Sequence, residues 1–130
     1  MTHRYIGTKE VVAWAADKDG KPGYGVKYAD GYTSWSPKGV FEEAYRTSEP
    51  GLCQVLNFGD ALHYLKAGAR VSRAGWNGKG LHVRMIRAGN AMDKGDDMKD
   101  CFGLSDGNGN IQPGWVASTG DLLANDWQVL

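Results

Sequence analysis

A capped amphipathic helix is predicted by the stretch NFGDALHYLKAG at residues 57–68. Asn57 can cap the first turn, Asp60 suits the positive end of the helix dipole, and Gly68 can end the helix. The apolar positions that fall on one helical face are Phe58, Ala61, Leu62 and Leu65. We therefore expect a helix that buries this face against the rest of its domain.

Short strands and turns follow this helix to the end of the chain. The predicted strands are residues 69–73, 81–87, 101–105, 109–112 and 127–130. The third and fourth form a hairpin across Asp106-Gly107-Asn108, and residues 88–99 between the second and third are interpreted as a solvated loop. Ser118 with Asp121 three residues later is typical of a capping box, which predicts a short helix through Leu123. The fold class is α+β, a small antiparallel β-sheet with short helices.

A smaller pattern precedes this unit. Residues 9–16, 24–28 and 32–35 alternate as short strands, and turn-forming residues separate them. Ser36 followed by Pro37 predicts the start of a short helix. We expect a small β-hairpin-plus-helix module at residues 1–46, a linker at residues 47–55 and a second domain at residues 56–130.

Charge and cysteine usage exclude several classes of function. Lys plus Arg and Asp plus Glu number 15 each, so no net charge attracts the chain to a DNA or RNA polymer or to a membrane surface. No stretch approaches the ~20 apolar residues of a membrane span, and no signal peptide is visible, which predicts a cytoplasmic protein. Cys53 and Cys101 are far apart and are expected to be reduced thiols.

Catalytic and metal-binding patterns are weak in this sequence. No nucleophile and base occur in a recognisable strand-to-helix turn, and His63 and His82 are interpreted as surface or interface residues. Asp93, Asp96, Asp97 and Asp100 lack the ligand spacing of a calcium loop and are interpreted as a solvated face. Gly78-Lys79-Gly80 is too short for a phosphate-binding loop. We predict no catalytic residue, no metal site and no cofactor.

Two glycine-rich turns, each with a tryptophan, form the candidate ligand site. Glycine lets a ligand approach the backbone, an indole offers a flat surface to a purine, and Arg73 or Lys79 can oppose phosphate charge. Ser118 and Thr119 can donate to a phosphate or ribose oxygen. The predicted site residues are Arg73, Trp76, Asn77, Gly78, Lys79, Trp115, Ala117, Ser118, Thr119 and Asp121. The alternative, favoured by composition alone, is that Trp76, Trp115 and Trp127 simply fill a small core.

Residues 56–130 resemble the phage-encoded Thoeris anti-defence type-two family. The resemblance rests on three ordered pieces, residues 56–62, 73–80 and 115–127. It implies a non-enzymatic homo-oligomeric sponge, a tetramer, that holds glycocyclic ADP-ribose between subunits in the host cytoplasm during phage infection. It also implies that some relatives bind cyclic oligonucleotides in a separate pocket. Residues 1–46 resemble a small phage module with no known activity, whose exposed aromatics would dock on the sponge unit or enlarge an oligomer interface.

Two other classes of function remain open from the sequence. An enzyme that cleaves such a signal is one, and the absence of a nucleophile, metal set and general-base pair counts against it. The other is a phage structural or host-interaction adaptor that binds no small molecule, in which the module at residues 1–46 is the active part and the tryptophan-bearing turns are core.

Overall fold

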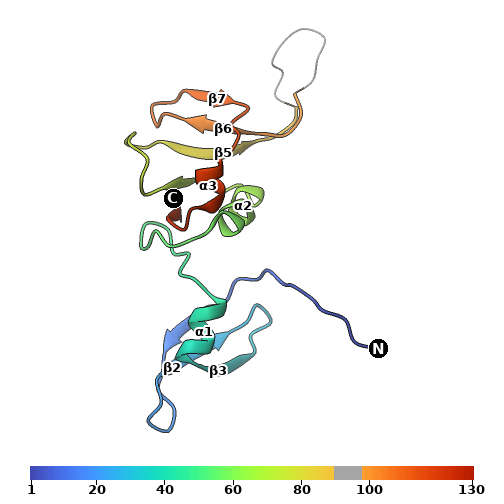
Figure 1. Cartoon of the computed structure of the whole chain (residues 1–130), viewed down its shortest axis with the longest axis vertical. Coiled ribbons are helices and arrows are strands. Elements are labelled where there is room, and N and C mark those ends of the chain that lie inside the picture. The colour runs from blue at the N-terminus through green and yellow to red at the C-terminus, as the bar shows by residue number, and fades with distance from the viewer. Residues whose placement is uncertain (90–97) are drawn as a thin grey trace. The chain divides into compact units, whose positions relative to one another are not determined.

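The computed structural model describes residues 1–89 and 98–130 (Figure 1). Those residues form two compact units, Met1–Arg46 and Thr47–Leu130, and each is described by itself below. The predictions made for Asp93, Asp96 and Asp97 fall outside the described residues. Among residues 1–89 and 98–130, no helix has the length and apolar character needed to cross a bilayer.

The first unit is an antiparallel sheet of three strands with one helix. Its elements are β1 (Val12–Ala15), β2 (Gly23–Lys27), β3 (Thr33–Pro37) and α1 (Lys38–Ala44). The strands pair in the order β1-β2-β3, which confirms the predicted sheet. Helix α1 lies against the face of the sheet that carries Tyr24, whose ring stacks on Phe41 at a centroid distance of 4.4 Å. This face forms the packed interior of the unit, with Val26 buried.

Helix α1 begins later than the sequence predicts. Ser36 was expected to cap the helix with Pro37 as its first residue, whereas strand β3 runs to Pro37 and the helix starts at Lys38. The reason is sheet pairing. Ser36 lies opposite Tyr24 in the β2–β3 ladder, so its backbone is extended, and its hydroxyl donates to the Pro37 carbonyl instead of capping a helix.

The second unit is a five-stranded antiparallel sheet with two short helices (Figure 1). Its elements are α2 (Phe58–Lys66), β4 (Val71–Arg73), β5 (His82–Ile86), β6 (Cys101–Ser105), β7 (Ile111–Pro113), α3 (Thr119–Leu123) and β8 (Trp127–Val129). The strand order is β7-β6-β5-β4-β8, so the last strand of the chain pairs with β4 and not with its neighbour in sequence. This arrangement confirms the predicted α+β class.

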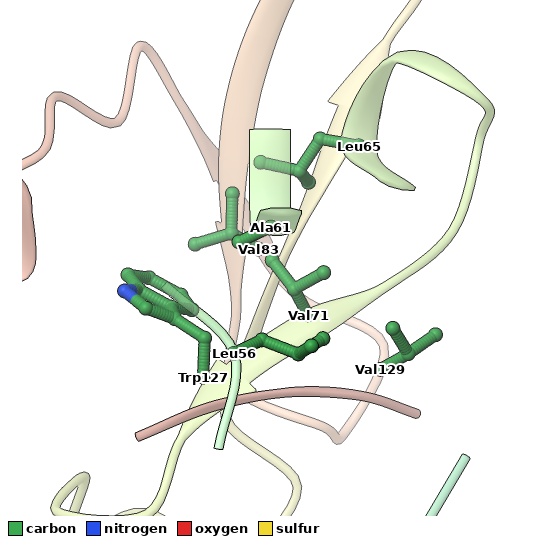
Figure 2. Packing of buried hydrophobic residues seen from close by; sticks show 7 residues of the cluster. All are labelled: Leu56, Ala61, Leu65, Val71, Val83, Trp127 and Val129. Carbon is green, nitrogen blue, oxygen red and sulfur yellow. The ribbon is translucent and has the colours of Figure 1, made fainter. Parts of the chain in front are cut away.

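One hydrophobic cluster joins helix α2 to this sheet (Figure 2). Ala61 and Leu65 point from the helix toward Val71 and Val83 of the central strands, and all four are fully buried. The remaining buried members are Leu56, Trp127 and Val129. Leu56 also exchanges backbone hydrogen bonds with Trp127, which fixes the start of α2 beside the last strand.

The predicted capping box of α3 and the predicted Asn57 cap of α2 are confirmed, and Asp60 completes a second capping box in α2. In α2 the Asn57 side chain accepts from the Asp60 backbone N–H at 2.8 Å, and the Asp60 carboxylate accepts from the Asn57 backbone N–H at 3.1 Å. Helix α3 repeats the pattern with Ser118 and Asp121. A capping box satisfies backbone donors locally, so it can be identified from residues three apart without knowledge of the fold.

The prediction that His82 is a surface or interface residue is wrong for this chain. His82 faces the side of the sheet opposite Val83, as alternation requires, but its side chain is buried. The ring Nδ1 lies 2.9 Å from the Gly80 carbonyl oxygen, and the close approach of Gly80 to Gly107 covers this end of the strand. Two glycines allow that approach, because a Cβ at Gly107 would lie 2.9 Å from the Gly80 backbone.

Burial of Leu65 predicts a large effect on stability. Leu65→Ala removes a side chain with no exposed area from the α2 core and is expected to lower the free energy of unfolding by about 2–5 kcal/mol. Leu52→Ala is the matched control, because Leu52 is 66% exposed in the same unit. Urea unfolding of the two variants measures the difference, and equal losses would contradict the core as described.

Candidate ligand-binding site

The two tryptophan-bearing turns meet in the structure. The rings of Trp76 and Trp115 lie edge to face with centroids 6.2 Å apart, although they are far apart in the sequence. Both rings also contact Trp127, at 5.3 Å from Trp76 and 6.3 Å from Trp115. Phe58 of α2 and Phe102 of β6 lie beside Trp115, each with its ring centroid 6.5 Å away. Neither phenylalanine was among the predicted site residues, although Phe58 was expected on the apolar face of α2.

The three indoles differ in exposure. Trp127 has no exposed area, which confirms that it belongs to the core. Trp76 and Trp115 are half-buried and pack against that core from outside. Each therefore has an anchored part, held by Trp127, and a part that solvent reaches. Neither a purely core role nor a free surface role describes these two residues.

Arg73, at the end of strand β4, holds two carboxylates. Its Nε donates to Asp126 Oδ1 and its Nη1 donates to Asp121 Oδ1, both at 2.9 Å. The side chain of Arg73 is 24% exposed, and that of Asp121 is 12% exposed. A guanidinium that spans two carboxylates ties strand β4 to helix α3 and to the turn before β8. The positive charge of Arg73 is thus largely compensated within the protein.

Asp121 makes contacts through every polar group it has. Its Oδ2 accepts from the Ser118 backbone N–H at 3.0 Å, its own N–H donates to Ser118 Oγ at 3.1 Å, and its carbonyl accepts from the indole N–H of Trp127 at 3.0 Å. Burial works to raise the pKa of Asp121. The hydrogen bonds from Ser118 and from the Arg73 guanidinium outweigh burial and hold this pKa below its usual range.

Asp126 sets the position of the first turn, and the sequence analysis missed it. Its Oδ2 accepts from the Gly75 backbone N–H at 3.3 Å, and its carbonyl accepts from the Ala74 N–H at 3.1 Å. Its other carboxylate oxygen binds Arg73. The only signal for this role in the sequence is an acidic residue immediately before the buried Trp127, and that signal is too common to be specific.

The remaining predicted site residues belong to the two segments that carry Trp76 and Trp115. Asn77, Gly78 and Lys79 are exposed in the turn between β4 and β5. Ser118 and Thr119 are exposed at the start of α3, and Ala117 before them is half-buried. The Ser118 hydroxyl oxygen already accepts one hydrogen bond, which leaves its proton for a donor role. The site thus combines partly exposed aromatic rings, one exposed lysine and two hydroxyls.

Among residues 1–89 and 98–130, no three His, Cys, Asp or Glu side chains lie together in a way that could hold a metal ion. Cys53 and Cys101 are free thiols. Asp100, the described member of the acidic run, pairs with Arg87 at 3.6 Å and accepts from the Ala88 N–H.

Comparison with known proteins identifies the second unit. Residues 56–130 match the model of the Thoeris anti-defense 2-like domain, which covers more than half of the chain. The chain belongs to this family. A relative named Thoeris anti-defense 2, from Bacillus phage SP01, is 30% identical over 91 residues, a region that covers 58% of this chain and 94% of the relative. The predicted resemblance is confirmed, and membership of the family supports a phage anti-defence role.

Protonation of Asp121 in acid should make the second unit less stable. Because the folded pKa lies below that of the unfolded chain, the carboxylate stabilises the fold at neutral pH, and this contribution is lost as the pH falls through the lowered pKa. We expect the unfolding temperature to fall as the pH is lowered below about 4. Asp121→Asn should be less stable at neutral pH and should show a weaker dependence on acid.

Thr119→Ala is the control, because Thr119 is exposed beside Asp121 but takes no part in the carboxylate contacts. Thermal unfolding is followed by circular dichroism between neutral and acidic pH, which gives the unfolding temperature of the parent and of each variant as a function of pH. A parallel fall for the parent and Asp121→Asn would show that other carboxylates cause the acid sensitivity.

Proposed function

We propose that the second unit binds and sequesters a cyclic ADP-ribose-type signal, glycocyclic ADP-ribose, and so blocks Thoeris-type immunity in the host cytoplasm. The relative from Bacillus phage SP01 is named for countering Thoeris. The observation that carries the proposal is the meeting of Trp76 and Trp115 at 6.2 Å beside exposed polar groups. Capture alone removes a signal from solution, so the proposal requires no chemical step.

An adenine ring is the ligand group that the indoles are expected to hold. Base stacking on an aromatic side chain is worth about 1–3 kcal/mol and needs a ring that is both accessible and fixed. The buried ring of Trp127 packs against the rings of Trp76 and Trp115 and holds them in place, so little side-chain entropy is lost when a purine stacks on them. Asn77 in the same turn is exposed, so its amide is available to hydrogen-bond the ligand, and Gly78 next to it packs against Leu81.

The phosphates and ribose are assigned to the polar residues near the indoles. Lys79 is exposed in the first turn and supplies positive charge. Ser118 and Thr119 supply hydroxyl donors next to the half-buried Ala117. Arg73 and Asp121, which bind each other, hold these groups in place. Arg73 can still add to the local positive potential, but with two carboxylates beside it the net contribution is small.

A second copy of the chain is expected to complete the pocket. Val116, which precedes α3, and Leu122 and Leu123, which end it, are 84%, 51% and 75% exposed. Large apolar side chains that stay in water beside a candidate site are typical of an interface between subunits. We therefore propose a symmetric homo-oligomer, a tetramer by analogy with the family, in which the ligand is held between protomers.

Binding is tested by calorimetric titration of the full chain with glycocyclic ADP-ribose isomers and, in a separate arm, with cyclic oligonucleotides. Trp76→Phe and Trp115→Phe keep most of the apolar volume but shrink the stacking surface, so each is expected to weaken binding by about tenfold to a hundredfold. Lys79→Ala should weaken binding modestly and reduce its dependence on salt.

Melting temperatures of the same variants separate binding from folding. Gln112→Ala is the matched control, since Gln112 is exposed in β7 of the same unit. Variants of Trp76 and Trp115 that lose stability yet bind as the parent does would show that the turns are scaffold. Failure of every signal tested to bind would reject the proposed function.

The proposed oligomeric state is tested by substituting residues of the expected interface. Leu122→Asp with Leu123→Asp places charge on exposed apolar positions and should convert the protein to monomers that bind the signal poorly. Leu52→Asp is the control, because Leu52 is equally apolar and 66% exposed in the same unit but lies outside α3. Light scattering during gel filtration measures the mass. A parent protein that is monomeric at micromolar concentration and still binds would contradict the shared pocket.

A further inference from the structure

The first unit carries a second aromatic surface, on the face of its sheet opposite α1. Trp14 of β1 and Trp35 of β3 both lie opposite Gly25 of β2 in the strand register, so both side chains leave the sheet on the same side. Tyr24, the neighbour of Gly25, points to the other side and stacks on Phe41 of helix α1. The two tryptophans therefore lie on the face that α1 does not cover.

Glycine in the central strand lets the indoles cover the backbone. A Cβ placed at Gly25 would lie 2.3–2.6 Å from three ring atoms of Trp14, and one placed at Gly23 would lie 2.3 Å from Cζ2 of Trp35. Any side chain at these positions would displace the rings. The two glycines thus form a floor on which an indole from each flanking strand rests, and the outer side of each ring is directed away from the sheet.

The rings are fixed yet accessible. Trp14 is 48% exposed, which is high for the largest apolar side chain. Trp35 is half-buried, and its indole N–H donates to the Ala16 carbonyl at 2.7 Å, which sets the orientation of the ring. Helix α1 and the sheet already provide this unit with an interior in Val26, Tyr24 and Phe41. The exposed indole of Trp14 therefore does not contribute to the hydrophobic interior of this unit.

Two lysines bring positive charge to this face, and the turn that carries Lys18 also carries Asp17 and Asp19. Lys27 is exposed at the end of β2, and the Lys18 ammonium lies 5.7 Å from the centre of the Trp35 ring. The strand residues on this face include no carboxylate; they are Val12, Trp14, Gly23, Gly25, Lys27, Thr33, Trp35 and Pro37. A complementary partner would have flat rings that stack on the indoles and negative charges that pair with the two lysines.

We propose that this face of the first unit binds a short segment of single-stranded nucleic acid, with bases stacked on Trp14 and Trp35 and phosphates beside Lys18 and Lys27. Aromatic platforms with nearby cations are the common means of binding single strands without sequence preference. In a duplex the base faces are hidden, so the duplex is not expected to fit. The zero net charge of the chain limits the affinity but leaves a local site possible, since only the nearest phosphates contribute.

This site goes beyond the proposed function and uses a different unit of the chain. Fluorescence anisotropy of a labelled oligothymidylate of about eight nucleotides, a length within the site sizes of small single-strand-binding domains, tests it on the full chain. Saturable binding that weakens as salt rises is expected. Trp14→Leu keeps apolar volume but removes the stacking plane, and should weaken binding by at least about tenfold.

Lys18→Gln with Lys27→Gln is the second variant, and it removes two exposed positive charges while keeping the length of the side chains similar. It should weaken binding and flatten its dependence on salt. Tyr32→Ala is the matched control, because Tyr32 is a 65% exposed aromatic of the same unit that lies before β3, and it should bind as the parent does.

Several results would overturn the proposal, and three of them come from the binding assay itself. They are the absence of saturable binding, equal binding of a duplex of the same length, and equal losses in Tyr32→Ala and Trp14→Leu. Self-association through this face that excludes the oligonucleotide would also overturn it, and would assign the face to a second copy. Titration of the same variants with glycocyclic ADP-ribose keeps the two sites apart, because the sponge activity should be unchanged in all of them.

Discussion

The contacts of Arg73 with Asp121 and Asp126 are the constraint on which the second unit depends. They join the end of β4 to helix α3 and to the turn before β8, at residues that lie 48 and 53 positions further along the chain. The same Asp121 caps α3 and receives the indole N–H of the buried Trp127. Loss of either partner would leave a partly buried charge without its counterion, which is more costly than the pair is stabilising. The tryptophan-bearing turns come together because this connection holds their ends.

The two aromatic surfaces of the chain are built in different ways. In the second unit, edge-to-face contacts tie Trp76 and Trp115 to Trp127, so each ring has a buried edge and an accessible part. In the first unit, Trp14 and Trp35 rest on a sheet whose central strand has glycine in place of side chains. The first arrangement fixes rings beside hydroxyls and a lysine, as a compact nucleotide ligand requires. The second gives an open surface suited to a flexible strand.

Features of the fold that depend on residues close together in the sequence could be predicted. Features that depend on contacts between distant residues could not. Both capping boxes depend on residues three apart, and the hairpin of β6 and β7 depends on the turn between them, so the sequence was sufficient for them. Trp76 and Trp115 were paired correctly because both stand in glycine-rich turns. The contact of Arg73 with Asp126 spans 53 residues, and the burial of His82 depends on two glycines from different turns, so no local pattern indicated either. Ser36 had a helix-capping signal, but pairing with β2 prevailed over it.

The central claim is that the protein captures its signal and leaves it intact. The most direct test is to incubate glycocyclic ADP-ribose with an excess of the full chain, remove unbound molecules by filtration, denature the protein by heat, and quantify the released compound by chromatography with mass spectrometry. Sequestration predicts that the compound is retained with the protein and is then recovered unchanged in full. Recovery of a cleaved product would show an enzyme, and passage of the compound through the filter would show that the tryptophan-bearing turns do not bind it.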